Sequence, residues 1–229
     1  MNKGLFKFFS CEKYRDDFLK GHLYFNSLNF FKRHEESEVL GQNDYYECCS
    51  IYQPESVNVY IGNLKLTDFA GPISISCNHD LLTSNIICFS TIRDDLYYNC
   101  KSFEEAKQNI LFPKELLNYG RYAVAIPQGH LLIKKIECAA LKNGFSLYHG
   151  LVNYYNYSKD NVSFKYPKIA FQKRSEFSYQ REYRFLLQKT NEEDKPVILE
   201  VGDLSDITMV VKSADINKML DISYSCEAE

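Results

Sequence analysis

Residues 171–187 read FQKRSEFSYQREYRFLL and form the densest pattern of aromatic and charged side chains in this sequence. The pattern continues as YQREYRFLLQ over residues 179–188 and alternates as a half-buried strand does. One face is predicted to carry Tyr179, Arg181, Tyr183, Phe185 and Leu187. The other face is predicted to carry, for the most part, Gln180, Glu182, Arg184 and Gln188. This polar face is either ordinary solvated sheet or the floor of a polar cleft in which a carboxylate lies beside a guanidinium.

The overall composition is typical of one globular domain. The 229 residues are 45% hydrophobic and carry a formal net charge of −3, so a sizeable core is expected and a general polyanion binder is not. The cysteines show no C-x-x-C spacing and the histidines are isolated from one another, which predicts no metal site and no disulfide framework. No apolar run reaches the length of a membrane span. We therefore expect a cytoplasmic protein with no membrane partner.

The N-terminal region predicts a strand, a helix and a second strand. Tyr14 and Phe18 share one face of the helix, which Ser10 is expected to cap and Gly21 to end. The three elements are expected at residues 4–10, 11–20 and 22–27. Their strands, together with the strand at 179–188, are expected to belong to one sheet.

The rest of the chain predicts short strands and helices without a linker or repeat. Residues 48–92 are β-rich, with a hairpin turn at Gly62–Asn63. Further helices are expected at 102–111, 113–120, 129–144 and 213–220, and further strands at 121–127, 196–201 and 207–211. We therefore predict a single α+β domain over residues 1–229, with a mixed or antiparallel sheet core, several short helices and a frayed tail at 225–229.

Four segments, in this order, resemble the pattern of a bacterial family of uncharacterised proteins. They are LYFNSLNFF (23–31), NDYYE (43–47), ICFS (87–90) and FQKRSEFSYQREYRF (171–185). The opening strand–helix–glycine–strand is in turn similar to the start of the ADP-ribosyltransferase superfamily. In that superfamily these elements shape an NAD pocket, and a late strand supplies a catalytic glutamate. The resemblance covers only part of the chain.

The resemblance implies an ADP-ribosyltransferase-like fold and assigns roles to particular residues. Glu182 matches the catalytic glutamate, Tyr24 and Ser27 match the central motif, and Lys7 stands where the superfamily has a histidine or arginine. NAD would be the substrate, and the acceptor would be a protein or a nucleic acid. The implied setting is a bacterial toxin or phage-defence effector with an antitoxin or regulatory partner.

The chemistry of such a reaction fits the residue types. Breaking the nicotinamide–ribose bond develops an oxocarbenium ion, which a fixed carboxylate such as Glu182 stabilises. Exchange of this glutamate for glutamine is expected to remove the charge and leave the fold intact. Phe31, like Tyr24, offers a ring that stacks on nicotinamide. Pyrophosphate needs cationic donors, for which the candidates are Lys173, Arg174 and Arg184.

Each candidate residue also has a purely structural interpretation. Glu182 and Arg184 would form a solvated cross-strand charge set. Tyr24 would be a core or rim aromatic, and Ser27 would cap the helix that begins at Leu28.

Two other function classes remain open from the sequence. The basic and aromatic segment 164–184 suits a non-catalytic module that binds nucleic acid or a partner protein, or an edge hairpin whose lysines prevent aggregation. A metal-dependent nuclease would use Asp44, Glu47 and Glu182 as ligands, and it ranks last. The deciding question is whether Glu182 and Tyr24 line one pocket.

Overall fold

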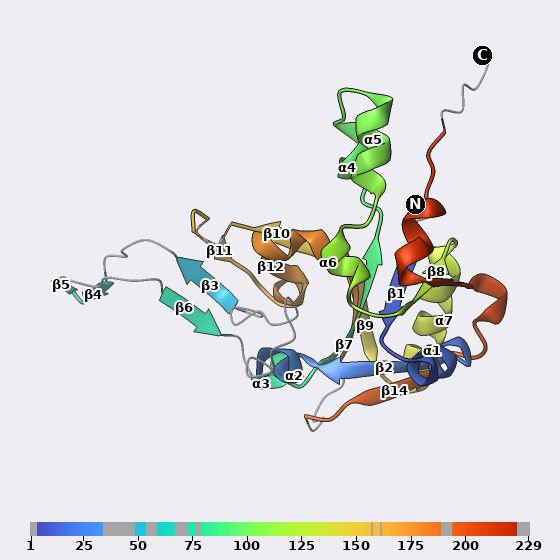
Figure 1. The fold of residues 1–229 in the computed structure, drawn as a ribbon. Helices are drawn as coiled ribbons and strands as arrows, with labels where there is room; N and C mark the ends of the chain where they lie inside the picture. Colours follow the sequence, from blue (N-terminus) through green and yellow to red (C-terminus); the bar gives the residue numbers. More distant parts are fainter. Residues whose placement is uncertain are drawn as a thin grey trace, which may run out of the picture.

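The computed structural model describes residues 4–33, 49–53, 59–66, 73–76, 79–156, 158–160, 162–188 and 194–223. Asp44, Glu47 and the expected tail at 225–229 lie outside these residues. The main body is an eight-stranded sheet, antiparallel throughout, with short helices around it (Figure 1). The expected α+β class, an antiparallel sheet with several short helices in one domain, is therefore confirmed.

Six strands of the main sheet lie side by side in one path. Their spatial order is β14 (Val197–Glu200), β2 (His22–Ser27), β7 (Asn85–Thr91), β1 (Leu5–Phe9), β8 (Tyr122–Ile126) and β15 (Met209–Lys212). β13 (Glu182–Gln188) also pairs with β7, and on its far side with β9 (Ser146–Leu151). The three strands that were expected in one sheet, β1, β2 and β13, are all hydrogen-bonded to β7.

The remaining strands form small separate sheets. They are β3 (Cys49–Gln53) with β6 (Ile73–Ser76) and β11 (Val162–Ser163), the hairpin β4 (Val59–Ile61) and β5 (Leu64–Leu66), and the parallel pair β10 (Asn153–Tyr155) and β12 (Gln172–Arg174). The hairpin turns at Gly62–Asn63, as predicted.

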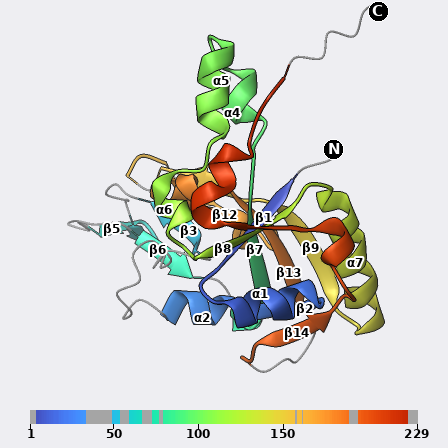
Figure 2. The ribbon, with the colours of Figure 1, turned by 45° about the vertical axis from the view of Figure 1, so that its right-hand side comes forward.

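Seven α-helices are described, most of them short. They are α1 (Glu12–Leu19), α2 (Leu28–Arg33), α3 (His79–Leu82), α4 (Asp95–Tyr98), α5 (Phe103–Ile110), α6 (Lys114–Leu117) and α7 (Gly129–Lys142). Short 3₁₀-helices cover Lys168–Phe171, Ser175–Gln180, Ser205–Ile207 and Ser213–Lys218. The α4–α5 pair projects away from the sheet (Figures 1 and 2). None of the described helices has the length and apolarity to cross a membrane.

The sheet splits along one side of β7. β2 pairs with the start of β7, where Asn26 lies opposite Ile86, and β1 pairs with its end, where Phe6 lies opposite Ser90. Cys88 lies midway and has no main-chain partner from either strand in these registers. The two strands therefore diverge, and in Figure 1 β2 runs almost horizontally while β1 rises away from it. The split leaves the middle of β7 without a strand partner on this side.

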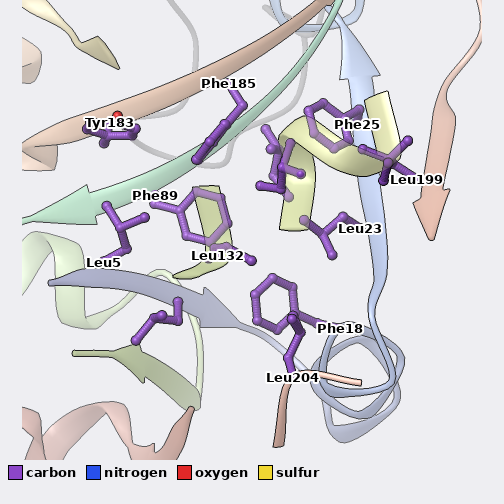
Figure 3. Packing of buried hydrophobic residues seen from close by; sticks show 14 of the residues in the cluster. Leu5, Phe18, Leu23, Phe25, Phe89, Leu132, Tyr183, Phe185, Leu199 and Leu204 are labelled. Atoms are coloured by element: carbon purple, nitrogen blue, oxygen red, sulfur yellow. The ribbon is translucent and has the colours of Figure 1, made fainter. Parts of the chain in front are cut away.

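The largest hydrophobic cluster lies on the face of the sheet covered by α7 and α1. Phe89 of β7 and Phe185 of β13 meet edge to face, with ring centroids 5.6 Å apart, and Leu132 of α7 packs into the same cluster (Figure 3). On the opposite face of β13, Leu186 packs with Leu28 in a second cluster. The strand that was expected to be half-buried is therefore buried on both faces.

Some local expectations were wrong. The strand expected at 179–188 begins only at Glu182, because Ser175–Gln180 forms a 3₁₀-helix and Arg181 has a left-handed backbone with φ of 50°. In α1, Phe18 is buried but Tyr14 is 59% exposed, and Ser10 is not its cap because Cys11 occupies that position. Likewise, the terminal helix expected at 213–220 is a shorter 3₁₀-helix over Ser213–Lys218.

The predicted stop at Gly21 is confirmed. Its φ is +88°, and a β-carbon at this position would lie 2.0 Å from the carbonyl oxygen of Gly202. Only glycine accepts both conditions. The turn is what sends β2 back along the sheet after α1.

Candidate functional site

A cavity of about 280 Å³ lies at the split of the sheet. β7 lines it with Ile86–Ser90, between the segments that β1 and β2 contribute. Six residues that the sequence singled out are in its wall: Lys7, Tyr24, Phe31, Lys173, Glu182 and Arg184. Glu182 and Tyr24 therefore line one pocket, although far apart in the sequence. We call this space the split cavity.

Glu182 is held between two cations inside the split cavity. Its Oε1 accepts a hydrogen bond from Lys173 Nζ at 2.8 Å, and its Oε2 accepts one from Arg184 Nε at 2.7 Å. Glu182 is 6% exposed, Lys173 4% and Arg184 only 1%, so this triad of side chains is almost completely removed from water. The expectation of a carboxylate beside a guanidinium in a polar cleft is confirmed, and the solvated cross-strand interpretation is wrong.

The carboxyl group of Glu182 is strongly acidic despite its burial. Burial alone raises the pKa of a carboxyl group, but Arg184 and Lys173 attract the charged form and donate hydrogen bonds to it. Together the two cations overcome the effect of burial and lower the pKa of Glu182 below its ordinary value of 4.5. The cavity thus contains a fixed negative charge at neutral pH.

Neighbouring side chains hold the triad in place. Lys173 Nζ also donates to Oε1 of Gln180 at 2.7 Å, and Gln180 Nε2 donates to the hydroxyl of Tyr119 at 2.7 Å. The main-chain N–H of Glu182 donates to the hydroxyl of Tyr154 at 2.9 Å. Arg184 Nη1 donates to the carbonyl oxygen of Ala170 at 2.8 Å. These bonds satisfy buried polar groups and restrict the carboxylate to one orientation.

Lys7 occupies the gap in the sheet. Its Nζ donates to the main-chain carbonyl oxygen of Cys88 at 2.7 Å, at the position that neither β1 nor β2 pairs. Burial lowers the pKa of Lys7, an effect partly countered by Cys88 and Glu182. The Cys88 thiol is no candidate nucleophile, because burial and the charge of Glu182 raise its pKa to about 12.

Two aromatic side chains lie at the edge of the split cavity. Tyr24 projects from β2 and is 54% exposed, so it is a rim aromatic rather than part of the core. Phe31 of α2 is half-buried and meets Phe30 edge to face at 5.6 Å. Both rings are placed where a planar ligand group can stack.

The structure places two of the predicted site residues elsewhere. Ser27 is buried and outside the wall of the split cavity, and its Oγ accepts a hydrogen bond from the N–H of Phe30 at 3.0 Å. It caps α2, as the structural interpretation held. Arg174 also lies outside the cavity wall and pairs with Glu176 at 2.9 Å. Its position on β12 turns it away from its neighbour Lys173, because side chains alternate along a strand.

The basic segment does not present a continuous cationic surface. Lys173 and Arg184 are buried, and Arg181 donates to the carbonyl oxygens of Ile110 and Asn109. Most of the cations that suggested a nucleic-acid surface are therefore engaged inside the fold.

The described part of the chain contains no group of three or more His, Cys, Asp or Glu side chains placed to hold a metal ion. The nuclease hypothesis also needs Asp44 and Glu47, which lie outside the described residues. The described neighbours of Glu182 are cations rather than further carboxylates, which does not favour metal binding at this position.

Several residues of the site were not assigned from the sequence. Gln180 was predicted to lie on the polar face but was given no role. The only sequence signal for its place in the site was its alternation with Glu182 and Arg184. Tyr119 and Tyr154 reach the triad from distant segments, and nothing in their local sequence predicts that contact.

Comparison of the chain with protein-family models, curated proteins and solved structures found no match.

Proposed function

We propose that the split cavity binds NAD and that the protein is an ADP-ribosyltransferase-like enzyme. The observation that supports this most is the convergence of Glu182, Tyr24 and the cations in one cavity at the split of the sheet. The carboxylate would contact the ribose, the aromatic rim would stack on the nicotinamide, and the excess of positive charge would attract the pyrophosphate.

Glu182 would act on the bond between nicotinamide and ribose. As this bond breaks, its electron pair leaves with the nicotinamide nitrogen and positive charge develops on the ribose ring. An ionised carboxylate in a site of low dielectric stabilises that charge. Each carboxylate oxygen already accepts one hydrogen bond and keeps a second lone pair for a ribose hydroxyl. The acceptor then bonds to the anomeric carbon and releases a proton.

The cations would hold the pyrophosphate. Among the described residues of the cavity wall, the cationic side chains of Lys7, Lys173 and Arg184 face one carboxylate, that of Glu182. The excess positive charge attracts an anion, and it acts over a short range because little water screens it. Tyr24 and Phe31 would stack on the nicotinamide ring. The acceptor would be a protein or a nucleic acid, in a toxin or phage-defence setting with an antitoxin or regulatory partner.

The test measures NAD binding and nicotinamide release on the same preparations. Glu182→Gln is expected to lower nicotinamide release by about two to three orders of magnitude and to change NAD affinity far less, because the charge acts mainly in the transition state. The matched control is Glu176→Gln, the same exchange on a partly exposed glutamate outside the cavity wall. Circular dichroism at the assay temperature must show both variants folded.

Two results would contradict the proposal. One is wild-type protein that shows no saturable NAD site by calorimetry and releases no nicotinamide. The other is a folded Glu182→Gln variant with wild-type turnover.

A further inference from the structure

A second and larger cavity, of about 730 Å³, adjoins the split cavity. Lys7, Tyr24, Asn26 and Ile87 line both spaces, so the two cavities are neighbours that share part of their walls. We call the second space the outer cavity. A ligand in it would lie next to a ligand in the split cavity, with the ring of Tyr24 between them.

The outer cavity is built on the outward face of the β2–β14 pair. Two cross-strand pairs form its floor, because His22 lies opposite Glu200 and Tyr24 opposite Ile198. The alternate residues of these strands, such as Leu199, are in the core, so this face is fixed by the pleat. α1 adds Tyr14 and Asp17 and α2 adds Phe30.

Four aromatic or aliphatic side chains of the outer cavity are unusually exposed for their type. Tyr14, Tyr24 and Phe30 are each more than a third exposed, and Ile198 is 62% exposed. Aromatic and apolar groups from four separate elements thus meet at one hollow instead of being covered. Such a concentration marks a binding surface more often than scattered exposed residues do.

The charge of the outer cavity is opposite to that of the split cavity. Asp17 and Glu200 both line it, and neither carboxylate makes a hydrogen bond or ion pair with any residue that the structure describes. The cation in its wall, Lys7, is engaged with the carbonyl oxygen of Cys88 on the side of the split cavity. Carboxylates combined with open aromatic faces attract a cation, through Coulomb attraction and through the ring quadrupole.

We propose that the outer cavity binds a lysine or arginine side chain of a partner protein. A long apolar stem with a cationic end matches a hollow whose wall is largely aromatic and aliphatic and in which the two carboxylates outnumber the ammonium group of Lys7. Identification of that partner as the acceptor of ADP-ribose rests on the proposed function, whereas cation binding rests on the outer cavity alone.

The binding test uses short peptides and no NAD. Gly-Arg-Gly, blocked at both ends, is titrated into the whole protein and followed by amide NMR shifts, with blocked Gly-Gln-Gly as the uncharged comparison. Only the arginine peptide is expected to bind, with shifts on β2, β14 and α1. The double variant Asp17→Asn with Glu200→Gln should weaken binding by about tenfold, since each exposed charge pair contributes a few-fold. Tyr14→Ala should weaken it by about fivefold.

The control removes carboxylates of the same kind elsewhere. Glu104→Gln with Glu115→Gln changes the charge equally, on α5 and α6, and should leave peptide binding unchanged. Equal binding of both peptides, absence of saturable binding, or an unchanged affinity in the Asp17 and Glu200 double variant would overturn the proposal. If NAD shifts the outer-cavity signals and competes with the peptide, the outer cavity belongs to the dinucleotide and the proposal is also overturned.

The two proposals fail separately. Loss of peptide binding with intact NAD cleavage would remove the cation site only. Peptide binding without any interaction with NAD would retain the cation site and contradict the proposed enzyme.

Discussion

The Lys173 ammonium lies 2.8 Å from Oε1 of Glu182, and this contact joins two separate sheets. Lys173 belongs to β12 in the small parallel pair, whereas Glu182 opens β13 in the main sheet. Both side chains are buried. The charged centre of the split cavity therefore exists only when the small sheet is packed against the main one, which makes Lys173 and Glu182 structural as well as functional candidates.

We expect Glu182→Gln to destabilise the protein, contrary to the expectation from sequence. Removing one member of a buried ion pair leaves the remaining charge unpaired and typically costs about 3–5 kcal/mol. The free energy of unfolding from urea denaturation measures this cost. Lys173→Met and the double variant complete a mutant cycle, in which the double variant should lose less than the sum of the single variants. Additive losses would mean that the two groups are not coupled.

The contribution of Glu182 to stability should depend on pH. Its pKa is lowered in the folded state, because Arg184 and Lys173 outweigh burial. A lowered pKa means that the stabilisation is fully present above the ordinary value of 4.5 and is lost as the pH falls toward the folded-state pKa. The difference in unfolding free energy between wild type and Glu182→Gln should therefore be constant from neutral pH down to about pH 5 and shrink below it. A difference that grew on acidification would contradict this assignment.

Tyr24 should affect ligand binding and leave stability unchanged. Because its side chain is largely exposed, Tyr24→Ala should change the unfolding free energy by less than about 0.5 kcal/mol. Loss of ring stacking should weaken NAD binding by about 1–3 kcal/mol, and Tyr24→Phe should retain most of the affinity. Calorimetry measures the unfolding free energy and the NAD affinity of each variant. The control is Tyr98→Ala on α4, another exposed tyrosine outside both cavities. A similar loss in the control would argue against stacking at Tyr24.

Ser27→Ala distinguishes a helix cap from a catalytic residue. The Ser27 hydroxyl caps α2, so its removal should lower stability by about 1 kcal/mol. Thermal unfolding measures this loss. Nicotinamide release per folded molecule should stay at the wild-type level if the enzyme proposal holds, and a selective loss of turnover would return Ser27 to the catalytic set.

Arg181 offers a test of backbone strain beside Glu182. Its φ of 50° is unfavourable for residues other than glycine, and its guanidinium donates to the carbonyl oxygens of Asn109 and Ile110. Arg181→Ala and Arg181→Gly both remove these bonds, but only glycine relieves the strain. Arg181→Gly should therefore be more stable than Arg181→Ala by about 1 kcal/mol in urea denaturation. Equal stabilities would show that the left-handed conformation costs little.

The alternation of residues 182–188 could be predicted because it depends on the backbone alone. Successive side chains of a strand point to opposite faces, so Glu182 and Arg184 had to share one. The start of the strand could not be predicted, since an arginine with positive φ at position 181 has no signal in its residue type. The local sequence pattern predicted the helix stop at Gly21 correctly, but it wrongly placed Tyr14 with Phe18 on the buried face of α1. The glycine acts within its own turn, whereas burial of the tyrosine depends on what packs over α1.

The contacts that make the site came from tertiary packing. The pairing of Glu182 with Arg184 is local, but Lys173 reaches the carboxylate only through the arrangement of two sheets. Tyr119 joins the site by accepting a hydrogen bond from Gln180. Lys7 joins it by donating to the carbonyl oxygen of Cys88, where the sheet splits. The resemblance placed Lys7 near the site, although its bond to the Cys88 carbonyl oxygen has no counterpart in the sequence pattern.

The hydrogen bond from Lys7 to the main-chain oxygen of Cys88 makes the site depend more on the number of residues in β7 than on the side chain at position 88. The acceptor is a main-chain oxygen, so every amino acid at position 88 would still present it. A one-residue insertion between the segments paired with β2 and β1 would instead turn the following residues to the opposite side of the strand. Lys7 would then face a different peptide group, and Ser90 would leave its register with Phe6. Substitutions at Cys88 should consequently be tolerated as far as their volume allows, whereas insertions and deletions within Ile86–Ser90 should abolish the site even when the protein folds.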